Sequence, residues 1–152
     1  MKEPLVSRIL RFTLYSVLVL SALMTVTMPI MLDTYFRVLY DAYSPQHGYR
    51  VFIMSFLMFV GAGGTWVVWE MVLMLRSIPT NPFVLRNVRA LRRVGIISAI
   101  LAAAFLAKCF VYVTFLTMVG TAILVLACLF AFTLASLFRQ AVAFREENDL
   151  TI

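Results

Sequence analysis

A chain of 152 residues in which 63% are hydrophobic and only 13% are charged cannot cover a soluble domain with polar surface. With a mean hydropathy of +0.98, it is expected to be an integral membrane protein. The net charge of +6 would favour nucleic-acid binding in a soluble protein. Here it indicates arginine-rich loops that orient membrane helices and contact anionic lipid headgroups, without direct nucleic-acid contact.

Four apolar runs are each long enough to cross a bilayer core, which takes about 20 helical residues. They are continuous rather than alternating, so they predict helices and not the strands of a barrel. We therefore predict an all-α, four-helix bundle that forms one membrane domain over residues 1–152. The expected spans are residues 12–32, 51–75, 94–112 and 115–138.

Basic residues are unevenly distributed between these spans. The first loop has Arg37 and Arg50 beside Asp33 and Asp41, and the third connection has no basic residue. Most of the others lie in the N-terminal arm, the second loop and the tail: Lys2, Arg8, Arg11, Arg76, Arg86, Arg89, Arg92, Arg93, Arg139 and Arg145. The positive-inside rule then places both termini and the second loop in the cytoplasm. The chain is expected in the plasma membrane as a multi-pass protein with N-in/C-in topology.

The first span and the loop after it contain a proline and several aromatic residues. Pro29 is expected to bend the helix near its outer end. The loop over residues 33–50 is expected to lie in the headgroup layer as a short surface helix, with a turn at residues 44–48. Binding of an outer peptide or lipid by its aromatic residues is the alternative.

Small residues recur on three spans and favour close helix packing inside the bundle, with a homodimer as the alternative. They are Gly61 to Thr65 on the second span, Ala99, Ala103 and Ala107 on the third, and Ala127, Ala131 and Ala135 on the fourth.

Two charged segments adjoin the third and fourth spans. Asn81 can cap a helix and Pro82 suits its first position, so the third helix is expected to begin in the cytoplasm as an amphipathic lead with arginines on one face. The fourth helix is expected to run past Arg139 to about Asn148, which makes residues 139–152 a cytoplasmic helical extension and tail. Opposite charges on these two segments predict a clasp within the chain or a shared site for a partner.

Glu70 and Lys108 are the ionisable residues expected inside the spans. Such residues are functional candidates by default, and Glu70 could carry protons or cations in a small transporter. The competing interpretation pairs Glu70 with a neighbouring helix, with Arg76 or with the arginine-rich lead, and lets Lys108 extend outward on its long stem. A direct pair between the two is not expected, because they lie at different depths.

No grouping of residues suggests catalysis. Glu70 has no second acid near it, no nucleophile is accompanied by a base, and no glycine-rich phosphate loop is present. Cys109 and Cys128 lie in apolar runs without the spacing of a zinc or redox site. We expect neither an enzyme nor a protein with a metal or cofactor.

Two cytoplasmic motifs resemble those of the bacterial membrane family DUF2975, on a four-span layout that covers the whole chain. The first comprises Pro82-Phe83, Asn87-Val88, Leu91-Arg92-Arg93 and Gly95, and the second is the ending from Glu147 to Ile152. Members of this family are commonly encoded beside a small helix-turn-helix regulator of the Cro/C1 type. The resemblance therefore implies a membrane protein that holds or modulates such a regulator.

We accordingly predict a non-enzymatic regulatory protein that binds a cytosolic helix-turn-helix regulator. The alternatives are a transporter that uses Glu70 and a sensor of lipid or an extracellular ligand. The expected partner-binding residues are Arg86, Arg89, Arg92, Arg93, Glu146, Glu147, Asp149, Leu150 and Ile152.

Overall fold

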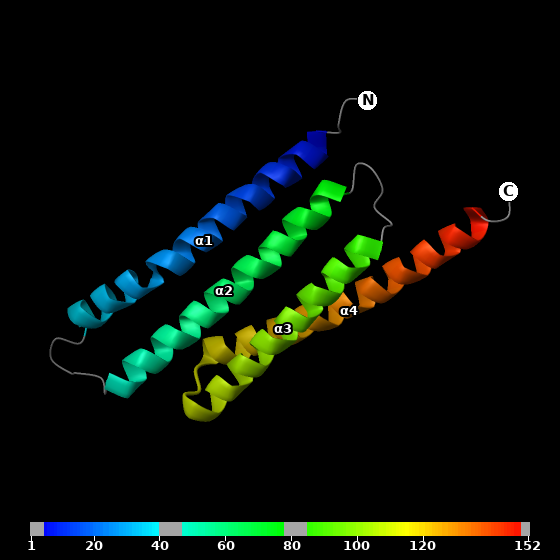
Figure 1. Cartoon of the computed structure of the whole chain (residues 1–152). Helices are drawn as coiled ribbons and strands as arrows, with labels where there is room; N and C mark the ends of the chain where they lie inside the picture. Colours follow the sequence, from blue (N-terminus) through cyan, green and yellow to red (C-terminus); the bar gives the residue numbers. More distant parts are fainter. Residues whose placement is uncertain (1–4, 40–46, 78–84, 150–152) are drawn as a thin grey trace.

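A computed structural model describes residues 5–39, 47–77 and 85–149, and these residues form four long helices (Figure 1). They are α1 (Leu5–Leu39), α2 (His47–Ser77), α3 (Leu85–Val111) and α4 (Phe115–Asp149). Each is long and apolar enough to cross a membrane, as the four apolar runs predict. The chain is therefore a candidate multi-pass membrane protein with an all-α fold.

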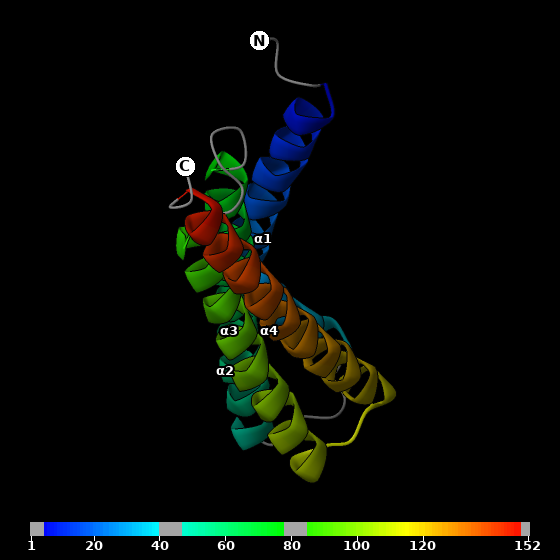
Figure 2. The same cartoon turned by 90° about the vertical axis from the view of Figure 1, so that its right-hand side faces the viewer.

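The helices pack as a bundle in which each one contacts its neighbours along the chain. Contacts join α1 to α2, α2 to α3 and α3 to α4, and among the described residues α1 and α4 do not touch. Figure 2 shows α4 lying obliquely across α3 rather than closing a ring with α1. The bundle is open along one side, so α1 and α2 leave much of their surface exposed.

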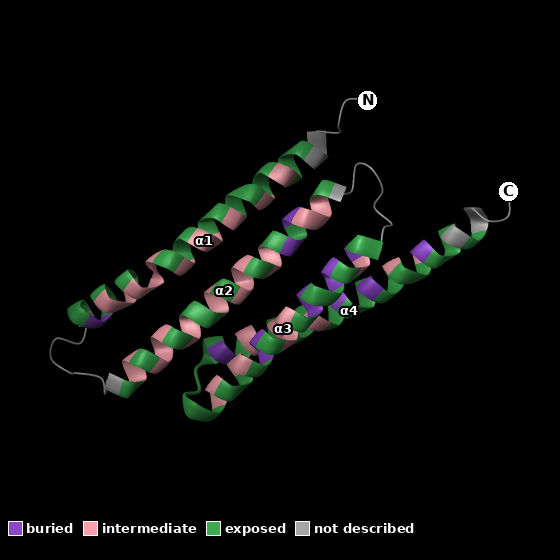
Figure 3. Ribbon diagram, viewed as in Figure 1, coloured by how far each residue is buried: buried purple, intermediate pink, exposed green. Residues whose placement is uncertain are grey.

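The buried residues concentrate where α3 meets α4 and where α2 meets α3. Leu91, Val94 and Leu101 of α3 are buried, as are Ala131 and Ala135 of α4, and Figure 3 shows few buried positions on α1. Large exposed apolar side chains occur on all four helices. Such a surface is unsuited to water but suited to a bilayer, where lipid tails are as apolar as the protein core.

The glycines of α2 allow the helices on both of its sides to approach closely. A Cβ added at Gly61 would lie 2.7 Å from Thr25 Oγ1 of α1, and one added at Gly63 would lie 2.8 Å from Leu101 Cδ2 of α3. The packing role predicted for this small-residue patch is therefore confirmed at Gly61 and Gly63, but not at Gly64, which faces open space, or at Ala62, which is exposed. The alanine stripes are confirmed only in part, because Ala131 and Ala135 are buried whereas the following three alanines are exposed: Ala103, Ala107 and Ala127.

We expect Gly61→Ala to destabilise the chain by about 1–3 kcal/mol, the usual cost of overpacking a close contact. Thr25 is β-branched, and its hydroxyl donates to the carbonyl of Ser21 at 2.8 Å, so the threonine cannot easily turn away. Gly64→Ala is the matched control, because a Cβ there meets nothing within 4 Å. Unfolding in detergent micelles measures both; equal stability of the two variants would contradict the close packing.

The connection between α1 and α2 differs from the sequence prediction. Residues 33–39 continue α1 and residues 47–50 begin α2, so the expected surface helix in this loop is wrong over the described residues. Continuing the helix avoids the unpaired backbone groups that an additional helix end would leave. The turn predicted at residues 44–48 lies partly outside the described residues. The helix start predicted at Asn81 and Pro82 lies wholly outside them.

A tight corner joins α3 to α4. The carbonyl of Lys108 accepts from the backbone N–H of Tyr112 at 2.8 Å, which closes the last turn of α3. The carbonyl of Thr114 accepts from the N–H groups of Thr117 and Met118, which opens the first turn of α4. From this corner α4 runs without a break to Asp149, so the extension predicted beyond Arg139 is helical.

Candidate functional site

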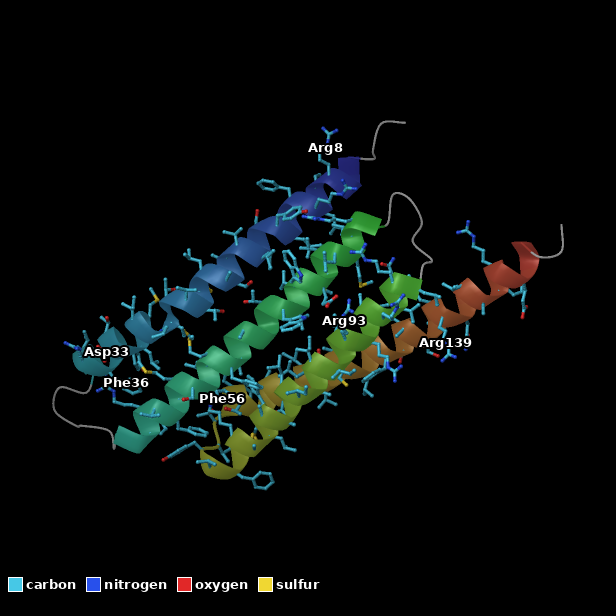
Figure 4. The ribbon with its side chains drawn as sticks, in the orientation of Figure 1. Arg8, Asp33, Phe36, Phe56, Arg93 and Arg139 are labelled. Atoms are coloured by element: carbon cyan, nitrogen blue, oxygen red, sulfur yellow. The ribbon has the colours of Figure 1, made fainter. Side chains whose placement is uncertain are left out.

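One end of the bundle collects most of the basic side chains. The first turns of α1 and α3 and the last turns of α2 and α4 lie at this end (Figure 1). Figure 4 places Arg8, Arg93 and Arg139 toward it, away from Asp33 and Phe36. We call it the arginine-rich end. Its described arginines are Arg8, Arg11, Arg76, Arg86, Arg89, Arg92, Arg93, Arg139 and Arg145.

The first turns of α3 are amphipathic, as predicted. Asn87 is 2% exposed, and Ala90 and Leu91 are also buried. Arg86, Arg89 and Arg92 are exposed on the other faces. Because buried and exposed positions alternate with the period of a helix, packing against α4 fixes which way the arginines point. The three exposed arginines form a basic surface, and they make no ion pair among the described residues.

Arg93 belongs to a different environment from these three arginines. Its Nε donates to Glu70 Oε1 at 2.7 Å and its Nη2 donates to Glu70 Oε2 at 2.8 Å, so the pair is bidentate. The Glu70 side chain is 6% exposed, whereas that of Arg93 is 51% exposed. The pair links α2 to the lead of α3, and it agrees with the interpretation of Glu70 as a partner of the arginine-rich lead.

The acidic end of α4 extends beyond the described start of α3. Gly95 lies against Phe132, and in an antiparallel pair this places Leu85 near Val142, which is buried. Glu147 is exposed and lies about 7 Å farther along the helix axis, at roughly 1.5 Å per residue. Arg145 and Glu147 both have interaction partners. The predicted clasp is not among the described ion pairs.

The remaining acidic and apolar residues of the tail are only partly described. Glu146 and Asp149 belong to α4, but their side chains are not described. Leu150 and Ile152 lie outside the described residues. Their expected role in partner binding therefore stays a prediction.

The opposite end of the bundle is held by one acidic residue and an aromatic cluster. Asp33 accepts from Arg37 on the next turn of α1 at 2.8 Å and from Arg50 of α2. Phe36 is buried and lies 5.4 Å from the Arg50 guanidinium carbon. The rings of Tyr49 and Tyr112 meet edge to face at 4.7 Å between centroids. The aromatic residues of this region therefore join α1, α2 and the α3–α4 corner.

Lys108 lies at the same end of the bundle and contacts both α4 and α2. Its Nζ donates to Thr117 Oγ1 of α4 at 2.9 Å and lies 5.3 Å from the centroid of the Phe56 ring of α2. A bond to a neighbouring helix thus takes the place of the free outward extension expected from the sequence. Thr117 is 2% exposed, so this lysine contributes to packing at the corner.

Two polar side-chain contacts between α1 and α2 were not predicted from the sequence. Arg76 Nε donates to the hydroxyl of Tyr15 at 2.7 Å, which joins the last turn of α2 to α1. The Asp33–Arg50 pair joins the same two helices at the other end. Neither spacing has a recognisable sequence signal, because each pair joins two helices whose rotation about their axes the sequence does not specify.

The described residues contain no group of three or more histidine, cysteine, aspartate or glutamate side chains that could hold a metal ion. Cys109 and Cys128 are half-buried free thiols. The arginine-rich end thus brings exposed guanidinium groups and an acidic helix end to the same end of the bundle.

A family profile described as "Protein of unknown function (DUF2975)" matches residues 34–152, well over half of the chain. The match covers the end of α1 and all of α2, α3 and α4, so it is shorter than the whole-chain layout expected from the resemblance. No curated protein and no solved structure matches the chain.

Proposed function

We propose that this chain, which belongs to the DUF2975 family, is a non-enzymatic membrane protein that binds a small cytosolic helix-turn-helix regulator at its arginine-rich end. One observation carries the proposal: the basic lead of α3 and the acidic end of α4 lie at the same end of the bundle. In this proposal that end faces the cytoplasm of a bacterial cell, because the basic residues gather there.

The acidic end of α4 is the element that would select such a partner. A helix-turn-helix protein reads DNA with a basic surface that neutralises phosphates. Glu146, Glu147 and Asp149 would complement that surface, and Leu150 and Ile152 would add apolar contacts. If the regulator uses one basic face for both, binding to the tail competes with binding to DNA.

The basic lead of α3 would have a supporting role. Arg86, Arg89 and Arg92 are exposed, whereas Arg93 is committed to Glu70. Guanidinium groups near the surface of an anionic leaflet each gain about 1 kcal/mol from lipid headgroups. The three exposed arginines would hold α3 against the headgroups and contact acidic residues of the regulator at its rim.

The transporter hypothesis receives less support from the same geometry. Glu70 is nearly inaccessible, and both of its carboxylate oxygens are bound by Arg93. A carboxylate that carries protons or cations needs a route to solvent and an exchangeable partner. Here the pair resembles a fixed link between two helices.

We expect deletion of residues 146–152 to weaken binding of the regulator at least tenfold, which corresponds to about 1.4 kcal/mol. The measurement is co-flotation of a purified Cro/C1-type regulator with proteoliposomes that contain the chain, using a regulator from the neighbouring gene, the arrangement that the family resemblance implies. The matched control is a variant in which residues 146–152 are shuffled, because it keeps the composition and charge of the tail but changes the order of its residues. Unchanged co-flotation after the deletion would contradict the proposal.

A further inference from the structure

A groove runs between α1 and α2 on the open side of the bundle. Its volume is about 550 Å³, within the ~300–1,000 Å³ that ligand sites usually occupy. Both small and large side chains line it. The residues that matter here are Leu18, Ala22 and Val26 of α1, with Ala62, Trp66 and Trp69 of α2.

The polar atoms beside this groove are already satisfied within the protein. Thr25 donates to the carbonyl of Ser21 at 2.8 Å, and Thr65 donates to the carbonyl of Gly61 at 2.8 Å. The two hydroxyls also lie 3.4 Å from each other. A ligand in the groove would therefore meet methyl groups, indole rings and aliphatic side chains, which suit an apolar chain.

A cation lies beyond one end of the same groove, about two helical turns after Trp69. On α2, Ala62, Trp66, Trp69 and Arg76 follow one another at helical spacing on one face. Arg76 is exposed, and its Nε donates to Tyr15, which uses one of the five N–H donors of a guanidinium group. The centroid of the tyrosine ring lies 5.6 Å from the guanidinium carbon, so the contact holds the arginine about one turn of α1 beyond Leu18, where the groove lining begins.

The groove and the arginine beyond it together match the depth of one leaflet of a membrane. The lining residues of α1, from Leu18 to Val26, rise about 12 Å at roughly 1.5 Å per residue, and Tyr15, which holds Arg76, lies about one turn beyond Leu18. Half of a bilayer core is about 15 Å thick. An acyl chain that starts beside Arg76 would therefore end near the bilayer midplane, at the level of Val26.

We propose that the α1–α2 groove binds an anionic phospholipid, with one acyl chain along Ala22 and Ala62 and the phosphate against Arg76. A second copy of the chain fits less well, because a parallel copy would bring its own arginine-rich end against Arg76. An anionic headgroup instead supplies the opposite charge. The proposal does not depend on the binding of a regulator.

The two tryptophans of the chain make a direct test available, since both line the groove. The full chain in detergent micelles is titrated with phosphatidylglycerol that carries bromine atoms on its acyl chains, which quench indole fluorescence on contact. We expect saturable quenching that unlabelled phosphatidylglycerol reverses and phosphatidylcholine reverses much less. Equal reversal by both lipids would overturn the assignment of the headgroup to Arg76.

Two variants separate the acyl chain from the headgroup. Ala22→Leu fills the groove, and we expect it to abolish saturable quenching, whereas Ala127→Leu on the exposed face of α4 leaves it unchanged. Arg76→Gln should weaken phosphatidylglycerol about fivefold, whereas Arg139→Gln at another exposed arginine should not. Wild-type quenching in Ala22→Leu, or equal weakening by the two arginine variants, would overturn the proposal. Arg76 lies on the surface, so its variant remains informative if Ala22→Leu does not fold.

Discussion

Arg93→Ala is expected to destabilise the chain by about 3–5 kcal/mol, the usual cost of leaving a buried charge without its partner. Glu70 is 4% exposed at the contact between α2 and α3, so the variant would leave a buried carboxylate without its cation. Glu70→Ala is expected to cost less. Half of the Arg93 side chain is already exposed, and a released guanidinium group can turn toward water or lipid headgroups.

Two further variants make this expectation specific. Arg92→Ala removes a neighbouring exposed arginine and should change stability by no more than about 0.5 kcal/mol. Glu70→Gln in the Arg93→Ala background should recover much of the loss, because it removes the uncompensated charge. Unfolding in detergent micelles measures all four variants. The same small loss for Arg93→Ala and Arg92→Ala would show that the pair does not link the helices.

The number and type of the helices could be predicted from the sequence because a membrane leaves few options. A run of about 20 apolar residues in lipid can satisfy its backbone only as a helix or in a closed barrel. The continuity of α4 past Arg139 was also predictable, since no glycine or proline interrupts the chain from Ser136 to Glu147. Local sequence is therefore sufficient to predict a helix wherever its formation depends on backbone hydrogen bonding alone.

The rotation of each helix about its axis could not be predicted in the same way. In a soluble protein polar residues mark the outer face, but here the core and the lipid-facing surface are both apolar. The alanines of α3 illustrate the result, because Ala103 is exposed while its neighbour Ala102 is buried. Tyr15 and Arg76 form a contact for the same reason, with no sequence pattern that joins them.

The candidate site was predictable where charge rather than packing defines it. The amphipathic lead of α3 and the pairing of Glu70 with an arginine of that lead both follow from charges placed in an apolar chain. Which arginine pairs with Glu70 depends on the depth at which α2 and α3 cross. The sequence does not specify that depth, so it could not distinguish Arg93 from Arg86, Arg89 and Arg92. In the regulator proposal these three arginines of the α3 lead are available to a partner, whereas Arg93 is not.

The orientation of the bundle is the claim on which both the regulator proposal and the lipid headgroup assignment depend. The described arginines of the arginine-rich end far outnumber Arg37, Arg50 and Lys108 at the opposite end. Arg37 and Arg50 are further offset by Asp33, which pairs with both. The positive-inside rule acts on such differences, so we expect a single orientation in the plasma membrane rather than a mixture.

Cysteine labelling of spheroplasts tests this orientation most directly. Cys109 and Cys128 are replaced by alanine, and single cysteines are introduced by Val38→Cys at the opposite end and Leu85→Cys at the arginine-rich end, both at exposed positions. A membrane-impermeant maleimide should label the Val38→Cys variant in intact spheroplasts and the Leu85→Cys variant only after the membrane is opened. Labelling of the Leu85→Cys variant in intact spheroplasts would place the arginine-rich end outside the cell and contradict the account.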